Sequence, residues 1–320
     1  MRRAPFSALL ALAIVLTVVC PSAVHATDGV AVIIEIRPNA GDVQVRRSAQ
    51  TEWRPAQPLL TLRPGDQITV RQDARVTLVF IGSRGARVLG AADSPFLVVD
   101  EPPKNPTERA RESVSAIVQF FIGASREATQ VPIAVRTNPT MRPSILSPRD
   151  TRLLPGPVTF EWTGSPSVRY RIRVLGPEGV VWEAGDVTAG QTSYPAWAPP
   201  LAPGVRYQWQ LEAPNAATQH AYFELLGVDQ GDRIRTTLDL LNSEGVSQGS
   251  RSGVVVLRSG FLLQQGLYSE ARAELVSAVR VDPTEPTLHY LLGMLYEQAG
   301  LGDMAEREFW EARNLVSRRR

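Results

Sequence analysis

Short apolar stretches separated by polar turns dominate the chain from Val32 to Val99. The stretches are VIIEIR, DVQVRR, DQITV, RVTLVFI and PFLVVD. Apolar and polar residues alternate in RVTLVF and DVQVRR, as they do in antiparallel strands that bury one face. The pattern predicts a small all-β sandwich or barrel, which we place at residues 27–103.

A second β-like region extends over residues 145–226. Its apolar stretches are VTFEW, YRIRVLG, VVWEA, RYQWQLEA and HAYFEL, separated by segments that contain Gly or Pro. Several short strands at this spacing are typical of an all-β sandwich. The two β regions are therefore predicted to form separate domains.

The segment between them, residues 104–144, predicts one helix and an extended linker. Asn105 suits the N-cap, Pro106 the first helical position and Glu108 the third. Four apolar residues then fall on one helical face: Val114, Ile117, Val118 and Phe121. We interpret this as a connecting helix packed on a neighbouring domain. A membrane-surface helix is the alternative, although its polar face lacks an excess of Lys and Arg.

The last part of the chain, residues 227–320, contains an internal repeat. Residues of matching type recur 34 positions apart, in the pairs Ser259 and Gly293, Leu262 and Tyr296, Gly266 and Gly300, Ala271 and Ala305, Leu275 and Phe309, and Ala278 and Ala312. We place two helical units at residues 252–285 and 286–320. The preceding stretch DRIRTTLDLLNSEG predicts a capping helix with Ile234, Leu238 and Leu241 on one face and Gly245 as its stop.

The first residues indicate export. Arg2 and Arg3 precede an apolar run from Ala8 to Val19, and small residues end the segment. This is the pattern of a signal peptide, residues 1–26, with cleavage expected after Ala26. The run is shorter than the roughly 20 residues of a membrane-spanning helix. We expect a periplasmic or secreted protein without stable membrane insertion; lipidation at Cys20 is an alternative that Val19 disfavours.

Charge and composition exclude several functions. Cleavage after Ala26 leaves 32 Lys and Arg against 32 Asp and Glu, so we expect no nucleic-acid partner. The mature chain contains no Cys and only His220 and His289, which excludes disulfides and Cys/His zinc sites. Neither histidine is assigned a role.

Enzyme signatures are also missing from the sequence. It contains no phosphate-binding loop, dinucleotide fingerprint, HExxH motif or nucleophile elbow, and we predict neither catalysis nor a cofactor. Glu161 and Glu183 lie beside Trp162 and Trp182, which leaves a sugar-binding or hydrolytic cleft as an alternative to plain core packing.

The first β region resembles a known family. Gly41-Asp42-Val43, Trp53, LRPGDQITV from Leu62 and ARVTLVFIGS from Ala74 follow one another as in the FecR-type periplasmic domain of iron-dicitrate sensor regulators. The resemblance implies a small all-β fold. Those regulators carry a cytoplasmic anti-sigma segment, for which no counterpart precedes the signal peptide here.

Two further resemblances concern the later regions. Leu201, Pro203, Gly204 and Tyr207 are similar to the tyrosine corner of fibronectin type III and related immunoglobulin-like domains. That likeness implies a core position for Trp162 and a bond from Tyr207 back to the backbone. The 34-residue period resembles tetratricopeptide repeats.

The tetratricopeptide likeness implies a groove lined by the first helix of each unit. It places four residues towards a partner: Leu263, Tyr290, Met294 and Glu297. About three units are normally needed for stability, so we expect the last pair to pack on the sandwich or to receive a partner. A purely stabilising role for the two repeats is the alternative.

Together these features predict a non-catalytic periplasmic adaptor or scaffold that binds a protein or a cell-wall component of the envelope. The alternative is a regulatory role in which the FecR-like region contacts an outer-membrane receptor or a membrane regulator.

Overall fold

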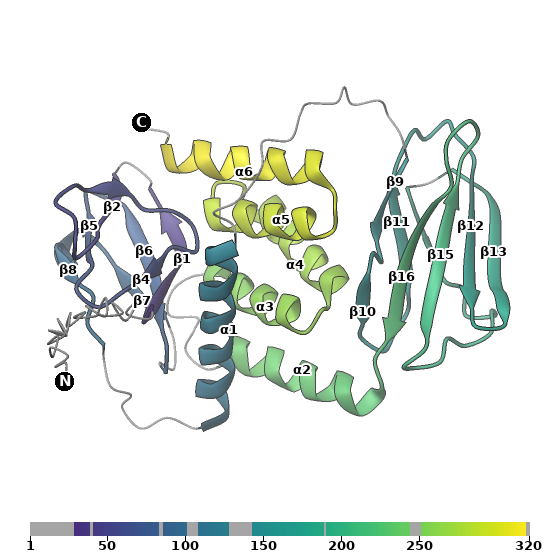
Figure 1. Cartoon of the computed structure of the whole chain (residues 1–320), viewed down its shortest axis with the longest axis horizontal. Helices are drawn as coiled ribbons and strands as arrows, with labels where there is room; N and C mark the ends of the chain where they lie inside the picture. The colour runs from purple at the N-terminus through teal and green to yellow at the C-terminus, as the bar shows by residue number, and fades with distance from the viewer. Residues whose placement is uncertain are drawn as a thin grey trace, which may run out of the picture.

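Helices lie between two β-sheet units in the computed structural model of the chain (Figure 1). The structure describes residues 29–38, 41–82, 86–100, 108–127, 143–188, 190–243 and 251–317. The predicted signal peptide lies outside these ranges. Within them the β-sheets end at Leu225 and helices follow, which confirms the predicted order of β before α. No helix in these ranges is both long and apolar enough to cross a membrane.

The N-terminal unit contains two four-stranded sheets, ordered β4-β1-β6-β7 and β3-β2-β5-β8. Its elements are β1 (Ala31–Arg37), β2 (Val43–Arg46), β3 (Arg54–Pro55), β4 (Thr61–Leu62), β5 (Gln67–Val70), β6 (Arg75–Phe80), β7 (Ala86–Leu89), the 3-10 turn η1 (Ala91–Asp93) and β8 (Phe96–Leu97). The sequence pattern did not predict the short strands β3, β4 and β7.

Strand β1 is buried on both faces. Ala31 and Ile33 belong to the core between the two sheets, whereas Val32 and Ile34 belong to a second core shared with the helices. A strand covered on both sides needs a continuous apolar run instead of alternation. The run AVIIEI in β1 therefore reflects the contact between the β unit and the helices.

Asp66 fixes the turn before β5. Its carboxylate accepts hydrogen bonds from Arg63 N at 2.9 Å and Ser48 N at 3.0 Å and pairs with Arg47 Nη1 at 2.6 Å. Gly65 adopts a φ of +89°, which favours glycine. The Gly-Asp pair thus has a structural role in this turn.

Helix α1 (Glu108–Glu127) lies between the N-terminal unit and the other helices (Figure 1). The four residues placed on one face, Val114, Ile117, Val118 and Phe121, are all buried in the shared core. Asn105 and Pro106 lie outside the described residues. Helix α1 is therefore buried along one face between the N-terminal unit and the other helices.

The second β unit packs a five-stranded sheet, β10-β16-β15-β12-β13, against a three-stranded sheet, β14-β11-β9. The strands are β9 (Ser144–Ser147), β10 (Thr151–Leu153), β11 (Thr159–Thr163), β12 (Tyr170–Gly176), β13 (Gly179–Val187), β14 (Gln191–Ser193), β15 (Arg206–Glu212) and β16 (Gln219–Leu225). Trp162 is buried in its core. Ala202 N donates a hydrogen bond to the Tyr207 hydroxyl at 2.8 Å, so Tyr207 bonds to the backbone as the resemblance to the tyrosine corner implied.

Helices complete the described chain: α2 (Val228–Ser243), α3 (Arg251–Gln264), α4 (Tyr268–Val281), α5 (Pro286–Gln298) and α6 (Gly302–Ser317). The residues predicted for the inner face of α2, Ile234, Leu238 and Leu241, are buried, and Gly245 lies outside the described residues.

The α3–α4 and α5–α6 pairs repeat one turn geometry. Gly266 and Gly300 have φ of +71° and +69°. Leu267 N donates to Leu262 O at 2.9 Å, and the bond 34 residues later, from Leu301 N to Tyr296 O, is 2.8 Å long. The sequence period therefore corresponds to a repeated helix pair.

Candidate functional site

The four predicted groove residues have different environments. Leu263 on α3 is only 5% exposed and belongs to the shared core. Tyr290 and Met294 on α5 are half-buried, and Glu297 on the same helix is exposed. A partner can therefore reach the three α5 residues, while Leu263 contacts the protein's own core.

Helix α1 and strand β1 occupy the groove of the first helix pair. A Cβ on Gly260 of α3 would lie 2.4 Å from Cζ of Phe121, and one on Gly253 would lie 3.3 Å from Cδ1 of Ile34. The two glycines thus allow close approach of α1 and β1 to α3. The surface that the sequence predicted to be open is filled from within the chain at this pair.

Two of the three accessible α5 residues, Tyr290 and Met294, are largely apolar, and the third, Glu297, is acidic. The Tyr290 ring packs on Phe309 with centroids 5.4 Å apart, and Met294 lies one helical turn further on. Burial, followed by the negative charge of Glu297, raises the pKa of the Tyr290 hydroxyl. This surface can take an apolar side chain flanked by a positive charge or by hydrogen-bond donors.

An ionic cluster joins β1 to the start of α5. Arg37 Nε lies 2.7 Å from Oε1 of Glu35, Arg37 Nη2 lies 2.5 Å from Oδ2 of Asp282, and Arg37 Nε lies 3.6 Å from Oε2 of Glu285. Burial opposes the charge of Asp282, but its bonds to Arg37 outweigh that effect and hold the pKa of the carboxyl below its ordinary value. One arginine thus faces three carboxyl groups across the interface.

Glu285 is the fully buried member of this cluster. Its side chain is 0% exposed, and its Oε1 accepts from Thr287 N at 3.1 Å, capping α5, and from Ile36 N of β1 at 3.2 Å. Burial, and then repulsion from Glu35, raises the pKa of Glu285 to about 8. Glu285 is therefore largely protonated at neutral pH and connects the N-terminal unit to α5.

The second β unit binds the two equivalent turns of the helix pairs. Arg149 Nε donates to Ala299 O at 2.6 Å, and Arg152 Nη2 donates to Gln265 O. These carbonyls are 34 residues apart and each follows the C-terminal end of a helix, where a positive charge is favourable. Two arginines three positions apart thus attach the β unit to both pairs.

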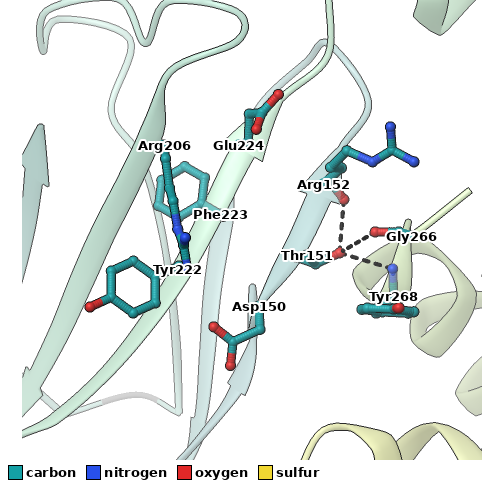
Figure 2. A pocket seen from close by; sticks show the side chains of 9 residues that line it. All are labelled: Asp150, Thr151, Arg152, Arg206, Tyr222, Phe223, Glu224, Gly266 and Tyr268. Carbon is teal, nitrogen blue, oxygen red and sulfur yellow. Dashed lines mark hydrogen bonds between the residues drawn. The ribbon is translucent and has the colours of Figure 1, made fainter.

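An open pocket of about 310 Å³ lies at this contact. Figure 2 shows its lining: Asp150, Thr151, Arg152, Arg206, Tyr222, Phe223, Glu224, Gly266 and Tyr268. The Thr151 hydroxyl accepts from Tyr268 N at 2.9 Å and lies 3.1 Å from Gly266 O. The Arg206 guanidinium lies 4.3 Å from the centre of the Tyr222 ring. Many of the polar groups that line the pocket are thus engaged with one another.

The residues considered for glycan binding have structural contacts. Trp162 and Trp182 are buried in the sandwich core and offer no face for stacking a sugar. Glu161 Oε2 pairs with Arg272 Nη1 of α4 at 2.7 Å, and Glu183 pairs with Arg173 at 2.9 Å. This removes the basis of the glycan alternative at these positions.

His289 and His220 differ in their surroundings. His289 is buried, with Nδ1 at 2.7 Å from Glu308 Oε2 and Nε2 at 3.1 Å from Pro283 O. Burial lowers its pKa, but the bond to Glu308 and further acceptors outweigh this and raise it. His220 is exposed. Among the described residues, no group of three or more His, Cys, Asp or Glu side chains is arranged so that it could hold a metal ion.

Sequence reasoning missed Glu285, Arg149 and Arg152. Glu285 precedes Pro286 at a helix start, which is a cap signal, but nothing local indicates its bond to β1. Comparisons with protein-family models and with curated proteins find no match for this chain. The proposals below therefore rest on its own residues and contacts.

Proposed function

We propose that the chain is a non-catalytic adaptor of the periplasm, exported by a signal peptide that is cleaved after Ala26, and that it binds a protein or a cell-wall component through the α5 part of its groove. The observation that carries the proposal is the difference between the two helix pairs: α1 and β1 cover the first, while Tyr290, Met294 and Glu297 of the second remain accessible. The binding surface is thus one helix pair long.

The finer fold assignments belong to this proposal. We infer a FecR-like N-terminal domain, an immunoglobulin-like or fibronectin III-like sandwich and two tetratricopeptide repeats. Support comes from the Gly65-Asp66 turn, from the bond between Tyr207 and Ala202 and from the matched turns at Gly266 and Gly300.

The packing supports a scaffold with a fixed geometry. The N-terminal unit contacts α3 and α5 through β1, and the second β unit contacts both helix turns through Arg149 and Arg152. A partner bound on α5 would therefore be held at a defined position relative to both β units.

Affinity capture from envelope extracts tests the proposal. We expect crosslinked complexes with the wild-type chain, and their loss with Tyr290→Ala combined with Met294→Ala. Val281→Ala, at an exposed position of α4, is the matched control and should retain them. Retention by the double variant, or hydrolysis of an envelope polymer by the purified chain, would reject the proposal.

A regulatory role is the second candidate, favoured by the outer sheet of the N-terminal unit. Leu97 and Val99, at and after β8, are 50% and 43% exposed, so this sheet offers apolar contacts to another protein. Genes for a sigma factor or receptor beside this one would favour regulation, and wall-synthesis or secretion genes would favour the scaffold.

A further inference from the structure

Helix α6 has an exposed face centred on a tryptophan. Ala305, Ala312 and Leu315 are its buried residues. Its exposed positions recur every three or four residues: Asp303, Glu306, Arg307, Trp310, Arg313 and Ser317. Trp310 is 57% exposed, and Figure 1 shows α6 at the outer edge of the helical layer.

The 34-residue repeat shows which residue of the α3–α4 pair corresponds to Trp310. Trp310 follows Val276 by 34 residues, and Val276 packs against the shared core. On the first helices of the two pairs, Leu263 is likewise buried while its counterpart 34 residues later, Glu297, is exposed. The α6 face thus carries a large apolar side chain at a position that the preceding pair packs inward.

The charges beside Trp310 are self-complementary. Glu306 lies one turn before it and Arg313 one turn after it, and neither forms an ion pair with another described residue. We propose that this face pairs with the same face of a second copy of the chain, antiparallel, about a two-fold axis near Trp310.

In this arrangement Glu306 of each copy comes beside Arg313 of the other, so the same ion pair forms twice. Arg307 of each copy comes close to the tryptophan of the other, a favourable cation–π contact. A parallel pairing would instead place like charges together. The order of charges along α6 therefore selects an antiparallel partner.

The contact is small, because one helix of each copy provides it, so we expect a dissociation constant on the order of micromolar. The assembly leaves Tyr290, Met294 and Glu297 outside the contact stripe. It would display two copies of the proposed binding groove, which increases avidity for a repetitive envelope partner.

Sedimentation velocity of the secreted chain across the micromolar range tests this inference. We expect a monomer–dimer equilibrium that Trp310→Ala weakens by about 30-fold or more. Trp197→Ala, which removes an 80% exposed tryptophan of the sandwich unit, should leave it unchanged. Circular dichroism should show that both variants are folded.

Charge reversal makes the test specific to the antiparallel geometry. Arg313→Glu should weaken dimerisation, and Glu306→Arg combined with Arg313→Glu should restore it. A wild-type chain that stays monomeric throughout the range, a dimer insensitive to Trp310→Ala, or a double reversal that fails to restore association would each overturn the proposal.

Discussion

Replacing Glu285 by Gln tests the account of the contact between β1 and α5. The amide keeps the Oε1 acceptor used by Ile36 N and Thr287 N and, like the protonated acid, carries no charge. We therefore expect the variant to fold normally and to lose the part of the pH dependence that Glu285 causes.

The sign and size of the effect follow from its pKa. Glu285 titrates at about 8 in the folded chain against an ordinary 4.5, so between these values the folded state retains a proton that the unfolded chain has released. The contribution of Glu285 to the wild-type free energy of unfolding therefore falls as pH rises from about 4.5 to about 8 and is constant above. At about 1.4 kcal/mol per pKa unit, the upper limit of this loss is about 5 kcal/mol.

Urea unfolding of wild type and variant at a series of pH values measures this pH-dependent loss of stability. We expect similar stability at about pH 5 and a variant more stable by about 2–5 kcal/mol at about pH 9. The lowered pKa of Asp282 contributes stability that is lost as pH falls, and the raised pKa of His289 contributes stability that is lost as pH rises. Both contributions are shared by the two proteins and cancel in the difference.

The matched control is Glu178→Gln, at an exposed position in the turn between β12 and β13, where the same substitution should change the free energy of unfolding by less than about 0.5 kcal/mol. A Glu285→Gln effect that is equal at all pH values would refute the reasoning, because it would mean that folding does not hold Glu285 protonated.

Two substitutions test the packing described above. Gly260→Ala should lower the free energy of unfolding by about 1–3 kcal/mol, since its Cβ would lie 2.4 Å from Phe121 Cζ. Gly302→Ala, with no atom within 4 Å of the added Cβ, should not lower it. Equal effects of the two substitutions in thermal melts would contradict the close contact between Gly260 and Phe121. Tyr207→Phe should cost about 1 kcal/mol by leaving Ala202 N without its acceptor, and an unchanged urea midpoint would show that this bond does not matter.

Local patterns in the sequence predicted most regular elements because each is specified by nearby residues. Alternation located β2, and the 34-residue period located α3 to α6. The same pattern located β6, but the expectation of one buried face was wrong there, because β6 is buried on both faces from Val76 to Phe80. The two-residue strands β3 and β4 have no periodicity of their own and form only because a neighbouring strand pairs with them. The sequence pattern alone could not indicate them.

The candidate site was predicted less completely than the fold. The period identifies the helix that carries Tyr290, Met294 and Glu297. It does not show that Leu263 is buried in a core to which α1 and β1 also contribute, because that core joins segments far apart in the chain. The bond between Ile36 and Glu285 spans 249 positions and leaves no local signal except the helix cap.

Site-specific photo-crosslinking in intact cells tests the central claim most directly. A photoreactive residue at position 294 should give a discrete adduct with an envelope protein or wall fragment, and Tyr290→Ala should suppress it. The same probe at position 281, an exposed site on α4, should not give this adduct. No adduct at position 294, or the same adduct at both positions, would contradict the proposal that the α5 groove is the binding surface.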